Sequence, residues 1–236
     1  MMKRKIGLFM LSVLLLAPFA LFSAAKAFAQ SSFTSNASIT FVPGEGTPPV
    51  LDPTDPTQPF EPGVEPGDPS DDPTNDAGPL TLDYVSSLDF GSHSIESEAT
   101  IYESTVLRPF IQVTDRRGTG DGWHVTAQLS AFANETETTL PGAVLTLKNG
   151  SVISTTTGGE PTANDPVALY AGGAAEIVVN AQENEGLGTW ITRWFPVNPS
   201  VPNVNDSVTL EIPAGAATVG DHQATITWTL HDAPGF

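Results

Sequence analysis

From residue 79 onward, hydrophobic residues occur in short runs that either alternate with polar residues or are wholly apolar. The runs are rich in Val, Ile, Thr and aromatic residues, and clusters of Gly, Pro, Asn and Asp separate them. Alternation has the period of an extended chain, so the pattern predicts strands. The predicted strands are Leu80–Val85, Pro109–Val113, Trp123–Leu129, Ala143–Lys148, Glu176–Asn180, Thr189–Phe195, Ser207–Ile212 and Ala224–Leu230. No stretch keeps a helical period, and we expect an all-β chain with a single antiparallel β-sandwich-like domain over residues 79–236.

The first 29 residues have the organisation of an export signal. Lys3, Arg4 and Lys5 precede an apolar run, and Ala27-Phe-Ala29 has the small-x-small form that a signal peptidase accepts. We therefore predict cleavage before Gln30. An uncleaved membrane anchor is the alternative, because the apolar run is nearly long enough to span a bilayer.

Residues 30–78 are predicted to be a disordered spacer between the signal and the domain. The stretch from Pro43 to Pro79 contains nine acidic residues and no basic one, and its repeated prolines favour an extended chain. Such a composition predicts too little buried apolar surface to offset the entropy of ordering. The carboxylates lack the spacing of a calcium loop, and no metal or cofactor is expected. Before this stretch, Ser32–Phe41 is predicted to form a short strand that docks elsewhere.

Charge and cysteine content limit the partners and the compartment. The chain has nine basic and 27 acidic residues, a formal charge of −18, and loss of the signal leaves five basic residues and a charge of −22. Nucleic acid and anionic membrane surfaces are excluded as partners, because both require clustered Lys and Arg. The absence of cysteine excludes disulfides, thiol catalysis and a lipoprotein anchor. The C-terminus shows no sortase motif, so we expect any attachment to a cell surface to be non-covalent.

The last predicted strand carries a specific motif. Ala224, Ile226, Trp228 and Leu230 point to one side of an extended chain, and the threonines between them point to the other. The stretch resembles the distal motif of the WxL family of Gram-positive surface proteins, Tyr-x-x-x-(Leu/Ile/Val)-Thr-Trp-x-Leu-x-x-x-Pro. Residues Ile226, Thr227, Trp228, Leu230 and Pro234 match this pattern, and His222 stands in place of the tyrosine.

Two further segments support the resemblance. Trp123-His-Val125 follows an Asp-Arg-Arg-Gly turn, as the first Trp-x-Leu of the family does, with Val125 in place of leucine. Leu80–Gly91 is similar to the opening of these domains. The resemblance implies a secreted, non-enzymatic protein that binds peptidoglycan non-covalently on the surface of a Gram-positive cell. It also implies a WxL-interacting surface protein as a partner.

The tryptophans allow two interpretations, because alternation alone does not distinguish a core residue from a stacking platform for sugars. Burial is favoured for Trp123 and Trp228, whose partners on the same face are aliphatic. Trp190 and Trp194 lie four residues apart, with Arg193 on the opposite face, and are predicted to form an exposed aromatic patch.

Other candidate chemistry is sparse. Arg116 and Arg117 lie in a glycine-rich loop and could bind anionic wall groups through their guanidinium groups. The more common interpretation is a turn between strands whose charged side chains are solvated. Asp115 and Asp121 flank this loop, and a carboxylate pair for glycan cleavage stays open. His222 and His231 bracket the last strand and could approach each other across a turn, but no metal-ligand spacing is present. Three functions remain: a wall-binding module, a subunit that reaches the wall only through partner proteins, and a carbohydrate-active enzyme.

Overall fold

The computed structural model describes residues 31–134 and 137–235, and in this part of the chain the fold is all-β. The predicted export signal lies outside the described residues. The described strands are β1 (Leu80–Val85), β2 (Thr100–Ser104), β3 (Phe110–Asp115), β4 (Trp123–Leu129), β5 (Phe132–Ala133), β6 (Thr138–Thr139), β7 (Val144–Leu147), β8 (Ser151–Ile153), β9 (Thr162–Ala163), β10 (Val167–Tyr170), β11 (Glu176–Ala181), β12 (Gly188–Arg193), β13 (Asn205–Ile212) and β14 (Ile226–His231). All their pairings are antiparallel.

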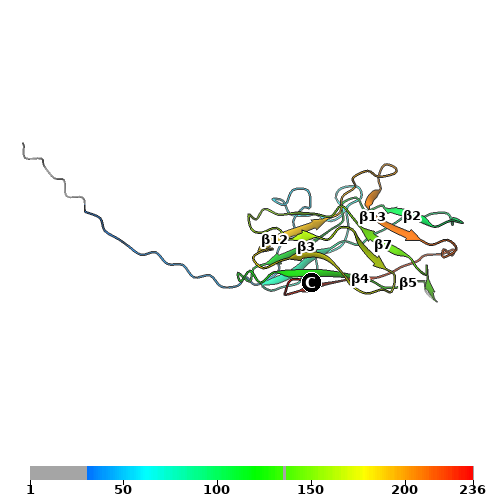
Figure 1. Cartoon of the computed structure of the whole chain (residues 1–236). Coiled ribbons are helices and arrows are strands. Elements are labelled where there is room, and N and C mark those ends of the chain that lie inside the picture. Colours follow the sequence, from blue (N-terminus) through cyan, green and yellow to red (C-terminus); the bar gives the residue numbers. More distant parts are fainter. Residues whose placement is uncertain (1–30, 135–136, 236) are drawn as a thin grey trace, which may run out of the picture. The chain divides into compact units, whose positions relative to one another are not determined.

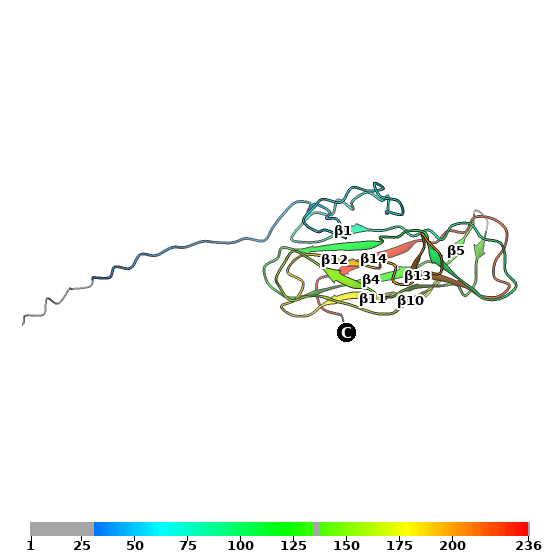
Figure 2. The same ribbon diagram turned by 90° about the horizontal axis from the view of Figure 1, so that it is seen from above.

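The strands form two layers. One layer contains two sheets, ordered β1-β3-β12-β8 and β10-β7-β13-β2. Three strands of the first sheet, β3, β12 and β8, are each consecutive in the chain with a strand of the second sheet, namely β2, β13 and β7. These partners have the same order in both sheets, so the two sheets form one layer that is interrupted at its middle. The opposite layer is the sheet β14-β4-β11-β9, which contacts β1, β8 and β10 of the first layer. Figures 1 and 2 show this arrangement.

All eight strands predicted from the sequence are present, and the predicted sandwich-like fold is confirmed. Between the layers, alternate residues of these strands form the main core, which includes Trp123, Leu129, Leu145, Leu169 and Val208. The sequence prediction missed β2 and β10 and several two- or three-residue strands. These strands are too short, or too polar on one side, to give a clear periodic signal.

Residues 44–78, here called the strap, are packed against the outer face of the β1-β3-β12-β8 sheet. The prediction that this stretch is a disordered spacer is therefore wrong. Val50 and Phe60 are buried with Tyr84, Phe110 and Ile191 in a second apolar cluster. The Phe60 ring meets Tyr84 and Phe110 edge-on, with ring centroids 5.3 Å and 5.0 Å apart.

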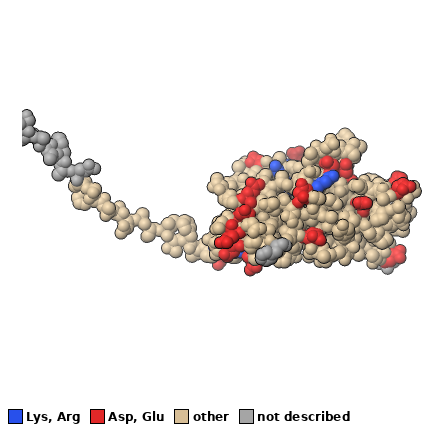
Figure 3. Space-filling view, in the orientation of Figure 1, with Lys and Arg blue, Asp and Glu red and all other residues tan. Residues whose placement is uncertain are grey.

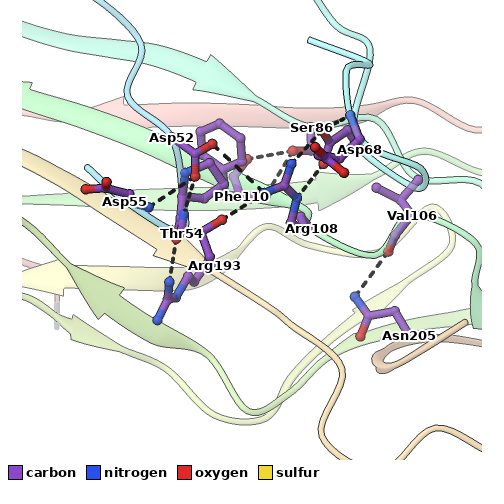
Figure 4. Close-up of polar contacts among 12 residues, drawn as sticks. Asp52, Thr54, Asp55, Asp68, Ser86, Val106, Arg108, Phe110, Arg193 and Asn205 are labelled. Atoms are coloured by element: carbon purple, nitrogen blue, oxygen red, sulfur yellow. Dashed lines mark hydrogen bonds and ion pairs between the residues drawn. The ribbon is translucent and has the colours of Figure 1, made fainter. Parts of the chain in front are cut away.

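Arginines of the sheet bind the strap through polar groups (Figure 4). Arg108 donates to Asp68 at 2.6 Å and to Thr54 at 2.8 Å, and Arg193 donates to the carbonyl of Pro53. Arg108 also lies 3.9 Å from Asp52. Two of the strap's carboxylates, those of Asp52 and Asp68, are thus paired with Arg108, which precedes β3. The prolines also lower the entropy that the strap loses when it docks.

A buried carboxylate lies under the strap. Asp83 on β1 accepts hydrogen bonds from Thr81 at 2.6 Å, Thr114 at 2.5 Å and Gln112 at 2.8 Å. Gln112 also donates to the carbonyl of Pro49 in the strap at 2.9 Å. Burial raises the pKa of Asp83 above its ordinary value of 3.8, although these hydrogen bonds and Arg116 oppose the shift.

This carboxylate predicts a specific pH dependence. Because its pKa is higher in the folded than in the unfolded chain, the folded state binds the proton more tightly. Above the folded-state pKa, burial of the charged Asp83 carboxylate lowers the stability of the fold. Protonation removes this cost as the pH falls through that pKa toward 3.8. We expect the wild-type chain to gain stability over Asp83→Asn as the pH is lowered across this window. Urea unfolding of both chains at several pH values measures this, and a pH-independent difference contradicts it.

Residues 31–40 belong to a separate unit, and residues 41–236 form the compact one. In the first unit, Phe33 and Ile39 are exposed. In the described part of the chain, no helix has the length and apolar character needed to cross a membrane.

Candidate functional site

The two Trp-centred motifs lie on adjacent strands of one sheet. β14 pairs with β4 so that Leu230 lies opposite Val125 and Trp228 opposite Ala127. Two segments about a hundred residues apart in the sequence therefore form one continuous surface on each side of the sheet.

On the inner side, Trp123 and Val125 are fully buried, as the sequence predicts. The Trp123 indole donates a hydrogen bond to the carbonyl of Gly186 at 3.0 Å. Gly186 has a φ of +74°, and a Cβ there would collide with the indole and lie 2.7 Å from the Cβ of Ala181. The first motif is thus part of the core, and a glycine is required beside it.

Trp228 and Leu230 also face inward but are only half-buried, because β14 is the edge strand of its sheet. The Trp228 ring lies 6.1 Å from that of Trp194, across the space between the layers. The distal motif therefore closes the side of the core.

Trp190 and Trp194 do not form the predicted exposed patch. Their side chains are 4% and 2% exposed and belong to the main core, and the Trp190 indole donates to the carbonyl of Leu187 at 3.0 Å. β12 lies between β3 and β8, so one of its faces must point to the opposite layer, and the tryptophans occupy that face. Arg193 lies on the other face, under the strap, as the alternation predicts.

Arg116 and Arg117 both hold other parts of the chain. Arg116 donates to the carbonyls of Gly46 and Gly78 at 2.6 and 2.8 Å, at the two ends of the strap. Arg117 pairs with the buried Asp115 at 2.7 Å and donates to the carbonyl of Asp232 at 3.1 Å. The hydrogen bond to Asp115 raises the pKa of Arg117. These contacts support a structural role for the two arginines rather than the gripping of an anionic ligand.

The outer face of β4 and β14 is polar. On β14, the side chains of Thr227 and Thr229 are exposed, and their cross-strand neighbours are Gln128 and Thr126 of β4. No Asp, Glu, Lys or Arg lies within either of these two strands. The face presents hydroxyl and amide groups, which can both donate and accept hydrogen bonds.

Two histidines extend this face at one end. The rings of His124 and His231 are stacked, with centroids 4.2 Å apart and an interplanar angle of 5°. The His231 Nε2 atom lies 3.2 Å from the Thr126 hydroxyl, and the His124 Nδ1 atom lies 2.6 Å from the carbonyl of Ala233. His231 thus meets His124 and not His222, whose imidazole contacts Thr139 and Thr218.

Pro234 lies in a tail that crosses the same face after β14. Gly235 donates to the Asn180 side chain at 2.9 Å and accepts from it at 3.2 Å. Together with the contacts of Ala233 and Asp232, these bonds fix the chain over β4 and β11. The proline at this position restricts the turn that the tail makes.

The structure brings together few groups suited to catalysis or metal binding. Asp115, one of the two carboxylates considered for glycan cleavage, is buried and held by Arg117. Within the described residues, no cluster of three or more His, Asp or Glu side chains could hold a metal ion.

One cavity, of about 640 Å³, was not anticipated from the sequence. It opens between the layers beside the start of β14, under the segments 88–95 and 217–224. Its lining is mixed, and includes the apolar residues Phe90, Tyr102, Leu129, Leu145, Leu210 and Ile226 and the polar residues Asp89, His93, Asp221 and His222. The sequence gives no signal for it, because it lies where two separate edges, of β2 and β14, approach each other.

Comparison with known protein families gives one match. The family model described as WxL domain surface cell wall-binding matches residues 28–234. The match begins well before residue 79 and therefore includes the strap. No curated protein and no solved structure matches the chain. In the view of Figure 3, carboxylates form a band at the left of the compact part and separate spots elsewhere, and few basic groups are visible.

Proposed function

The chain belongs to the WxL family of surface cell wall-binding domains, and from this premise we propose that it attaches non-covalently to peptidoglycan through the outer face of β4 and β14. On this proposal the protein is exported after signal cleavage and resides on the wall of a Gram-positive cell. There it acts as a structural or docking subunit of surface complexes.

The observation that supports the proposal is that this face is polar and that its two strands contain no Asp, Glu, Lys or Arg. The exported chain carries a formal charge of −22, and the wall contains anionic polymers, so long-range electrostatic repulsion opposes binding at neutral pH. Recognition must then be short-range. Thr227, Thr229, Thr126 and Gln128 can exchange hydrogen bonds with sugar hydroxyls and N-acetyl groups without placing a carboxylate at the contact.

A sedimentation assay with purified sacculi, stripped of teichoic acid and protein, tests the proposal. We expect the exported chain to co-sediment at pH 7, and the double variant Thr227→Glu, Thr229→Glu to lose at least tenfold in affinity with an unchanged melting temperature. Val197→Glu, Val219→Glu is the matched control, because it adds the same charge at exposed positions outside the sheets. Equal binding of the two variants contradicts the assignment to this face.

The second candidate is a subunit that reaches the wall only through a WxL-interacting protein. In the described part of the chain β14 has no strand on one side, and this favours the second candidate, because an unpaired strand edge is a common docking site for another chain. It predicts no sedimentation with bare sacculi at pH 5 or pH 7, and recruitment when the partner is added.

A further inference from the structure

The two sheets of the first layer differ in how their outer faces are covered. On the β1-β3-β12-β8 sheet the strap encloses Tyr84, Phe110 and Ile191, which are at most 1% exposed. On the β10-β7-β13-β2 sheet, Tyr170 and Ile101 are 60% and 61% exposed. Within the described residues, therefore, no segment covers this second sheet as the strap covers the first.

The exposed side chains lie in one row across the second sheet. The strand registers place four residues side by side, in the order Tyr170, Val144, Glu211 and Ile101. The next row contains Leu169, Leu145 and Leu210, which belong to the main core. Because side chains alternate along each strand, the first row lies on the outer face. This row, here called the docking row, has large apolar side chains at both ends and a carboxylate between them.

The carboxylate of the docking row is available to a partner. Glu211 is exposed, and in the described part of the chain its side chain makes no hydrogen bond or ion pair. Glu103, in the adjacent outer row, already accepts a hydrogen bond from the Ser200 hydroxyl at 2.8 Å. An ionised carboxylate only accepts hydrogen bonds, and it binds cationic donors most strongly. The docking row therefore favours a basic group between two apolar ones.

The strap shows how an extended segment binds a face of this layer. Gln112 of β3 donates to the carbonyl of Pro49 at 2.9 Å and accepts from the Leu51 amide at 2.8 Å. Arg193 of β12 donates to the carbonyl of Pro53. The strap thus crosses from one strand to the next, and polar side chains of the sheet hold its backbone while apolar side chains pack beside them.

The spacing of the docking row fits a segment that crosses the strands in the same way. Four adjacent strands place the ends of the row about 14 Å apart, and residues i and i+4 of an extended chain lie about 13 Å apart. Residues i, i+2 and i+4 also share one side of such a chain. Apolar residues at i and i+4 can therefore contact Tyr170 and Ile101, and a Lys or Arg at i+2 can reach Glu211.

We propose that the outer face of β10-β7-β13-β2 docks an extended segment of another protein with the pattern apolar-x-(Lys/Arg)-x-apolar. A second copy does not supply this segment. Lys148 has no apolar residue two positions away on either side, and the other basic residues of the exported chain are bound within their own fold, namely Arg108, Arg116, Arg117 and Arg193. The docking row lies on the layer opposite to β4 and β14, so this interaction is independent of the proposed wall binding.

Selection from a displayed library of random nine-residue peptides tests the proposal. The exported chain is the target, at about 0.15 M salt to screen its net charge, and peptides that also bind the Glu211→Lys variant are removed. We expect the remaining peptides to share the apolar-x-(Lys/Arg)-x-apolar pattern. Their dissociation constants should rise at least tenfold for the double variant Ile101→Ser, Tyr170→Ser, because it removes the apolar contacts at both ends of the row.

Matched controls make the same kinds of change at exposed positions outside this face. Glu183→Lys reverses a charge beyond β11, and Val64→Ser, Val219→Ser removes two exposed apolar side chains. Both controls should bind the selected peptides like the wild type, and all variants should keep its melting temperature. The proposal is overturned if no peptide survives the removal step, if the survivors lack the pattern, or if they bind the Ile101→Ser, Tyr170→Ser variant equally well. Self-association of the wild type that Glu211→Lys abolishes assigns the face to a second copy and also overturns it.

Discussion

Replacing Phe60 by aspartate is expected to lower the free energy of unfolding by about 3 kcal/mol, close to the cost of truncating a buried aromatic residue. Phe60 is 8% exposed and inserts between Tyr84 and Phe110 in the strap's apolar cluster. The loss has an upper limit, because the strap can detach and leave the sandwich folded. Urea unfolding measures the change, and detachment should also lower the m-value, since less surface remains to be exposed.

Val64→Asp is the matched control for this prediction. Val64 lies on the same strap and is 62% exposed, so the same substitution should change stability by less than about 0.5 kcal/mol. Equal effects at the two positions would show that the strap is not anchored through Phe60. The predicted contrast also separates a packed strap from the solvated spacer that its composition suggests.

The second large effect concerns the two motif tryptophans. Trp123→Ala is expected to cost about 3–5 kcal/mol, because the indole is completely enclosed and its N–H is bonded to Gly186. Trp228→Ala should cost clearly less, about 1–3 kcal/mol, because β14 lies at a sheet edge and the ring is half-buried. Thermal and urea unfolding of both variants measure the difference.

Thr227→Ala is the control for these substitutions, since Thr227 is next to Trp228 but faces solvent and should leave stability nearly unchanged. A larger loss for Trp228→Ala than for Trp123→Ala would contradict the burial seen here. If the expected order holds, the tryptophans of the two Trp-centred motifs are primarily core residues. That order is consistent with our proposal that the ligand binds the opposite side of the same strands.

This division of the sheet clarifies how the proposed function relates to the fold. Trp123, Val125, Trp228 and Leu230 fix β4 and β14 in the sandwich from the inner side. The same alternation places Thr227 and its neighbours outside, where they are available to a ligand. One sequence pattern therefore specifies both the packing and the candidate binding face.

The sequence by itself determined eight of the strands and the orientation of their side chains. Period-two alternation reports which residues share a face, and this was sufficient for Trp123, Trp228 and the threonines of β14. It also gave the family, through residues Ile226 to Pro234. The order of strands in the sheets did not follow, because it depends on pairings between segments far apart in the chain.

Only the tertiary structure decided which faces are buried and which charges are paired. Trp190 and Trp194 show the same alternation whether exposed or enclosed, and the opposite layer is what encloses them. The strap's composition predicts disorder when it is considered alone. Its Asp68 and Phe60 find Arg108 and Phe110 only because the folded sheet brings those partners to one surface. Burial and ion pairing are properties of two segments together, and a local sequence pattern describes only one of them.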